Sequence, residues 1–84
     1  MKHAGPAALD QLEPLLGDLR ALPALKEKTR GVFYRRGRAF LHFHEDPSGL
    51  HADLRLAGDD FDRFRVQDEA ERDALLALVL KGLG

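Results

Sequence analysis

Hydrophobic and polar residues alternate with a period of two through the middle of the chain, between residues 31 and 56. The alternation is clearest in one run of apolar residues: Leu50, Ala52, Leu54 and Leu56. Such a period places successive side chains on opposite faces of a strand. Two turn sequences divide this segment: Arg36-Gly37 and Asp46-Pro47-Ser48-Gly49. The second fits a type I turn. We therefore predict antiparallel strands over 31–35, 38–45 and 50–56.

The pattern changes to a helical period on both sides of these strands. The first helix is expected to open at Gly5-Pro6 and to stop at Leu22-Pro23, either kinking at Pro14 or restarting there. Its apolar stripe has six members: Leu9, Leu12, Leu15, Leu16, Leu19 and Leu22. The last helix is expected to start after the N-cap Asp68, with Glu71 completing a capping box, and to run to about Lys81.

These elements, with a shorter strand over 61–66, give the order helix, four strands, helix. Residues 23–30 are read as a polar connector, and residues 57–60 as a loop. The order predicts an α+β fold in a single domain spanning 1–84, with a four-stranded antiparallel sheet and both helices packed on one sheet face. The other face of the sheet is expected to be solvated or covered by a second subunit.

Candidate chemistry depends on the register of the hairpin formed by 38–45 and 50–56. If Glu45 pairs with Leu50, one face collects the apolar side chains and the other collects four polar ones: His42, His44, His51 and Asp53. A glycine bulge after Asp46 would shift the pairing by one residue and separate these side chains. The first register gives the cleaner apolar face, and we adopt it.

Three imidazoles and one carboxylate on neighbouring strands could converge on a divalent ion. Directly opposed side chains lie about 4.5–5.5 Å apart at Cβ. Zinc, nickel and copper favour imidazole ligands, and a site with an open position can activate water. The same histidines could instead be solvated, line a dimer interface or form a polar pocket for an organic ligand.

Composition limits the remaining classes of function. The chain has 84 residues, 44% of them hydrophobic, and no cysteine. Disulfides and thiolate metal sites are therefore excluded. A core this small gives a small net stability, so a homodimer is expected. No leader segment and no membrane-spanning run is apparent, and a cytoplasmic location is the default expectation.

The charge distribution raises a second candidate site. The formal net charge is −1, which argues against a general nucleic-acid binder. Basic residues nevertheless gather around Arg35 and Arg38, interleaved with aromatic ones, and we expect Phe33 and Phe40 to be neighbours on the histidine face. Exposed aromatic rings flanked by arginines can stack nucleic-acid bases. Arg35, Arg38 and Phe40 are therefore a candidate site for a ligand or single-stranded nucleic acid.

One stretch also carries a family resemblance. The run Gly37-Arg38-Ala39-Phe40-Leu41-His42-Phe43-His44, followed by Gly49-Leu50 and Asp53-Leu54, resembles the bacterial luciferase-like domain of small proteins. The name of that family implies no light-emitting reaction, and no catalytic residue is carried over. The resemblance implies the same strand layout.

Taken together, these patterns favour a homodimeric binding or interaction module without enzymatic activity. A divalent-metal protein using His42, His44, His51 and Asp53 is the first alternative. Single-stranded nucleic-acid binding through Arg35, Arg38 and Phe40 is the second.

Overall fold

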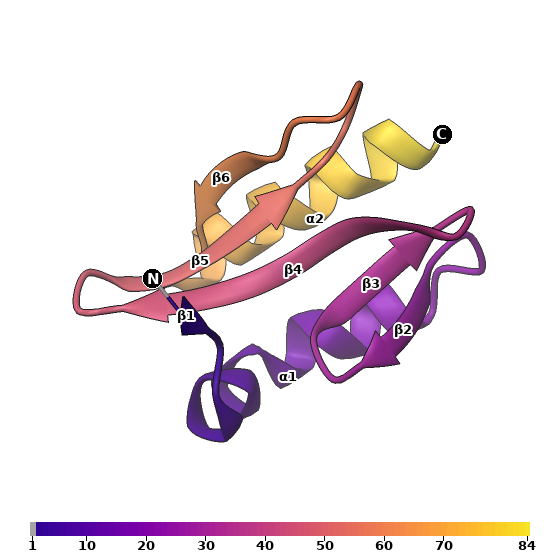
Figure 1. The fold of residues 1–84 in the computed structure, drawn as a ribbon. Helices are drawn as coiled ribbons and strands as arrows, with labels where there is room; N and C mark the ends of the chain where they lie inside the picture. Colours follow the sequence, from indigo (N-terminus) through magenta and orange to yellow (C-terminus); the bar gives the residue numbers. More distant parts are fainter. Residues whose placement is uncertain (1) are drawn as a thin grey trace.

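The structure, a computed structural model, describes residues 2–84, and the fold over this range is α+β. Within these residues two helices accompany one six-stranded antiparallel sheet (Figure 1). The elements in chain order are β1 Lys2–His3, α1 Pro6–Arg20, β2 Lys26–Thr29, β3 Val32–Arg35, β4 Arg38–Asp46, β5 Gly49–Leu54, β6 Asp62–Arg65 and α2 Glu69–Leu83.

The sheet is larger than the predicted four strands. Its order is β2-β3-β4-β5-β6, and β1 pairs with the C-terminal end of β4, at His44 and Glu45. The expectation that residues 23–30 form a connector is wrong for 26–29, which pair with β3. No strand was predicted before the first helix, but Lys2 and His3 form β1. Both missed strands are short and polar, so neither carries an apolar alternation that the sequence could show.

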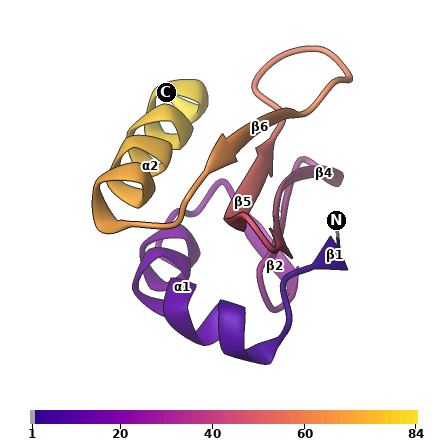
Figure 2. The ribbon, with the colours of Figure 1, turned by 90° about the vertical axis from the view of Figure 1, so that its left-hand side faces the viewer.

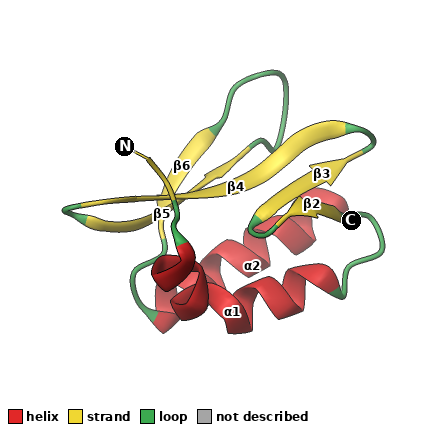
Figure 3. Cartoon of the chain, turned by 60° about the horizontal axis from the view of Figure 1, so that its bottom comes forward, coloured by secondary structure: helices red, strands yellow, loops and turns green. Residues whose placement is uncertain are grey.

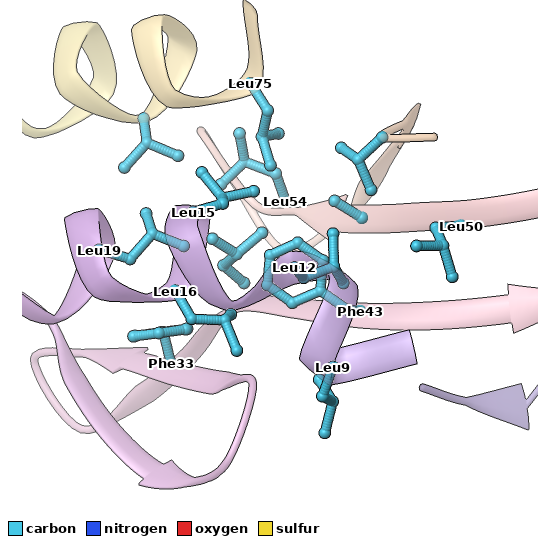
Figure 4. Close-up of a cluster of buried hydrophobic side chains, with 14 of the residues drawn as sticks. Leu9, Leu12, Leu15, Leu16, Leu19, Phe33, Phe43, Leu50, Leu54 and Leu75 are labelled. Carbon is cyan, nitrogen blue, oxygen red and sulfur yellow. The ribbon is translucent and has the colours of Figure 1, made fainter. Parts of the chain in front are cut away.

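Both helices cover the same face of the sheet, as predicted, and leave the other face open (Figures 2 and 3). The leucine stripe of α1 packs into a core with Phe33 and Phe43 from the sheet and Leu75 from α2 (Figure 4). Residues 31–56 therefore supply the sheet side of the core, as their alternation predicts. Neither helix in the described range has the length and apolar character needed to cross a membrane.

The helix boundaries agree with the sequence at their starts and differ at their ends. The first helix is continuous through Pro14, so it does not restart there, and it ends at Arg20 instead of Leu22. The second helix has the expected capping box: Asp68 accepts a hydrogen bond from the Glu71 amide, and Glu71 accepts one from the Asp68 amide. This helix continues past Lys81 to Leu83.

The β4–β5 register is the one adopted from the apolar pattern. Glu45 pairs with Leu50 and Asp46 with Gly49, so the alternative pairing of Asp46 with Leu50 is wrong. The Asp46 carboxylate accepts hydrogen bonds from the Ser48 amide at 2.8 Å and the Ser48 hydroxyl at 2.5 Å. These bonds close the turn locally and fix the register.

The pairing of β3 with β4 contains an irregularity that the sequence did not indicate. Phe33 pairs with Leu41 but Tyr34 pairs with Ala39, which leaves Phe40 as the extra residue of a bulge. Phe33 and Phe40 are 0% and 4% exposed and belong to the core. The expectation that these two rings lie together on the histidine face is wrong, because the bulge turns Phe40 toward the helices.

Candidate functional site

Polar side chains from β4 and β5 gather on the sheet face that the helices leave open. In the observed register His42 is opposite Asp53 and His44 is opposite His51. These positions alternate with Leu41, Phe43 and Ala52, which are buried in the core. The period of two that fills the core therefore also places the histidines on the open face.

Three of the four predicted residues are in direct contact. His42 Nδ1 lies 2.8 Å from His44 Nε2, and His44 Nε2 lies 3.2 Å from Asp53 Oδ2. The carboxylate accepts hydrogen bonds, so it favours a proton on His44 Nε2, which His42 Nδ1 can then share as an acceptor. The His44 side chain is 12% exposed. This chain of contacts fixes the orientation of both imidazoles.

A third imidazole comes from the opposite end of the sequence. β1 places His3 beside His44, with the ring centroids 4.7 Å apart and the rings stacked. The Ala4 amide donates to the Phe43 carbonyl at 3.0 Å, and the Gly5 amide donates to Glu45 Oε2 at 2.6 Å. These hydrogen bonds anchor the N-terminal segment along β4, so the position of His3 is defined by the fold.

Asp53 is held by Arg63 on β6. Arg63 donates two hydrogen bonds, from Nε to Oδ1 at 2.7 Å and from Nη2 to Oδ2 at 2.9 Å. These bonds hold the pKa of the Asp53 carboxyl below its usual value, although burial acts in the opposite direction. Asp53 is therefore ionised at neutral pH, and its charge is compensated by Arg63.

The pKa of His42 is lowered, mainly because burial disfavours the charged imidazolium and also because His44 lies beside it. His42 is therefore mostly neutral at pH 7. The neutral ring offers a nitrogen lone pair, which is the form that binds a metal ion.

His51 does not join the group as predicted. Among residues 2–84, one set of three metal-ligand side chains has its ligand atoms within 4.8 Å of one another, and it consists of His3, His42 and His44. His51 shares a cross-strand pair with His44 but is not in this set. We refer to His3, His42 and His44 as the histidine cluster.

The donor set of this cluster suits a divalent transition metal. Two nitrogens bound to one zinc ion at 2.0–2.1 Å in a tetrahedral arrangement are about 3.3 Å apart. The 2.8 Å contact between His42 and His44 would therefore lengthen by about half an ångström. An ion held by Nε2 would leave the proton of His44 on Nδ1, a buried atom that has no hydrogen-bond partner within the described residues.

The second predicted group, Arg35, Arg38 and Phe40, also comes together. These residues line a hollow of about 200 Å³ between the β3–β4 turn and the loop after β5. The Arg35 guanidinium lies 6.0 Å from the centre of the Phe40 ring. Because that ring is buried, it offers no exposed face for a stacked base.

Sequence reasoning missed several residues of these two sites. His3 lies in a two-residue strand, which has no periodicity to detect, and Arg63 lies in the polar run after the loop. Phe61, whose ring centre is 4.9 Å from that of His42, was expected only as the first residue of a strand. Arg55, in contrast, was placed on the histidine face by the alternation of the 50–56 strand, which gave it no partner.

Comparison with known proteins identifies no relative: no protein-family model, curated protein or solved structure matches the chain. The resemblance to the luciferase-like domain therefore stays a prediction.

Proposed function

We propose that this protein is a binding module that holds one divalent transition-metal ion at His3, His42 and His44. The observation that carries the proposal is the convergence of three imidazoles from β1 and β4, with ligand atoms within 4.8 Å of one another. Imidazole nitrogens favour zinc, copper and nickel over magnesium or calcium. Three protein ligands leave a fourth tetrahedral position for water or an outside ligand.

The neighbouring residues support this proposal. Asp53 Oδ2 lies 3.2 Å from His44 Nε2, so the carboxylate would lie beside an ion held by that nitrogen, where its negative charge favours a cation. Arg63 compensates the charge of Asp53, so the ion would enter a site that is close to neutral. Affinity would therefore depend on the three nitrogens more than on electrostatic attraction.

The test is a zinc titration of the untagged protein, followed by calorimetry and by the NMR signals of the histidine rings. We expect one ion per chain in the native protein. His3→Gln, His42→Gln and His44→Gln should each weaken binding by at least about tenfold, because each removes one ligand.

His51→Gln is the matched control, since it removes an imidazole from the same sheet face and leaves the cluster intact. Its affinity should equal that of the native protein. Weaker binding in the His51 variant, with unchanged binding in the His3 variant, would instead favour the set predicted from the sequence. The absence of uptake at micromolar zinc would contradict metal binding altogether.

A further inference from the structure

Four arginines surround the hollow at the end of the sheet remote from β1. Arg35, Arg36 and Arg38 come from the β3–β4 hairpin, and Arg55 follows β5. The ends of β3 and β5 and the start of β4 meet here because the strands are antiparallel neighbours (Figure 1). We call this set the arginine hollow.

The guanidinium groups of the hollow retain most of their hydrogen-bond donors. Arg35 donates to the Gly82 carbonyl at 3.3 Å, Arg38 donates to Asp59 at 2.7 Å, and Arg55 donates to the Ala39 carbonyl. Each guanidinium has five N–H donors, so each of these three keeps several free. Arg36 makes no hydrogen bond or ion pair with any residue in the described range.

The charge of the hollow is strongly unbalanced. Four arginines line the hollow, and the one carboxylate paired with any of them is that of Asp59, in an ion pair with Arg38 that is well exposed to solvent. Elsewhere on the molecule Arg20, Arg30 and Arg63 form ion pairs with carboxylates of α1, β2 and β5, whereas Arg35, Arg36 and Arg55 form none within residues 2–84. The hollow therefore concentrates positive charge on a chain whose formal net charge is −1.

Arg36 also has an unfavourable backbone conformation. Its φ is 53°, followed by a φ of 78° at Gly37, the pattern of a type I′ turn. Asn, Asp or Gly suits the first of these positions better than arginine does. Arg36 therefore costs stability in the turn and has no partner within residues 2–84. This combination suggests that its side chain serves to bind a ligand and not to stabilise the fold.

We propose that the arginine hollow binds a small phosphorylated molecule through a diphosphate group. Guanidinium groups match phosphate oxygens with paired hydrogen bonds, and several of them together balance a multiply charged group. The volume of about 200 Å³ suits a ligand of this size. The buried ring of Phe40 forms part of the wall, and recognition depends on the arginines.

The test uses inorganic pyrophosphate as the probe, titrated by calorimetry at fixed low salt. Native protein should bind one equivalent. Arg36→Gly should weaken binding by about tenfold while raising the melting temperature, because it removes a charge-assisted contact and relieves the turn. Asp59→Asn should strengthen binding by about two- to fivefold, because it frees Arg38 and removes a competing carboxylate.

Arg65→Gln is the control, since it removes one exposed positive charge at the opposite end of β5–β6, where Arg65 pairs with His51. Its affinity should match that of the native protein. Equal weakening in the Arg65 and Arg36 variants, or no pyrophosphate binding, would overturn the proposal. A single-stranded oligonucleotide that binds while pyrophosphate does not would also overturn it, in favour of a nucleic-acid backbone.

Discussion

Glu27 shows how one side chain connects separate parts of the fold. Its carboxylate accepts hydrogen bonds from Arg20 at the end of α1, at 2.5 and 3.1 Å, and from the Gly31 amide at 2.8 Å. Burial acts to raise the pKa of Glu27, but these hydrogen bonds outweigh it and the pKa lies below its ordinary value. The helix, β2 and the β2–β3 turn are therefore joined through an ionised carboxylate.

This lowered pKa predicts a pH dependence of stability. A group with a depressed pKa in the folded state stabilises the protein above its unfolded pKa, here the ordinary value near 4.5, and loses this contribution as the pH falls through the folded value. We expect Glu27→Gln to lower the free energy of unfolding at pH 7 and to flatten its decline below about pH 4.5. Urea unfolding between pH 3 and 7 measures both effects.

Asp18→Asn provides the control for this experiment, because it removes an exposed carboxylate of α1 that makes no hydrogen bond within residues 2–84. Its unfolding free energy should follow the native pH curve. If the free energy of unfolding declines below pH 4.5 equally in the Glu27 variant and the native protein, Glu27 does not contribute to this decline.

At the scale of elements, the capping box of α2 is the clearest local determinant. Asp68→Ala removes the side chain that accepts from the Glu71 amide at 2.8 Å. We expect the free energy of unfolding to fall by about 1 kcal/mol. Asp73→Ala, in the interior of the same helix, should leave it unchanged or slightly higher because alanine is the better helix former. Equal losses in the two variants would assign the effect to charge instead of capping.

The elements that the sequence predicted well are those with a clear apolar pattern. The apolar alternation gave the β4–β5 register, although the Asp46–Gly49 turn also allowed a glycine bulge, and this register brought His42, His44 and Asp53 together. The bulge at Phe40 was missed because nothing in the local sequence distinguishes it from regular pairing. β1 and β2 were missed because pairing with β4 and β3, and not intrinsic preference, makes them strands. The candidate site was therefore predicted in part, without His3.

At the scale of the whole molecule, the two outer strands determine how copies of the chain can meet. β2 has the sequence Lys-Glu-Lys-Thr and β6 has Asp-Arg-Phe-Arg. Charged side chains on an edge strand oppose pairing with another sheet. The expected homodimer stays a prediction, and association through these edges is disfavoured. A second copy of the chain would then associate more readily through the open face of the sheet.

We predict that the native protein forms no species larger than a dimer as its concentration rises, and that Lys26→Val/Lys28→Val associates further. The variant removes two charges that protect the β2 edge and adds residues that favour strands. Light scattering after size exclusion measures the mass across concentration. Asp59→Asn/Asp60→Asn, which changes two charges in a loop, should behave as the native protein does. Further association of this control would mean that lost charge alone causes it.

The short strand β1 has a consequence for any ion that binds beside it. A strand of two residues that pairs with one neighbour, β4, opens more readily than the rest of the sheet. While it is open, the cluster has two imidazoles instead of three, so apparent affinity is the affinity of the closed form scaled by the fraction of time that β1 is paired. By the same linkage an ion would hold the beginning of the chain against β4. Metal binding and the pairing of β1 with β4 would then be one coupled equilibrium, which either the metal affinity or the pairing of β1 could report.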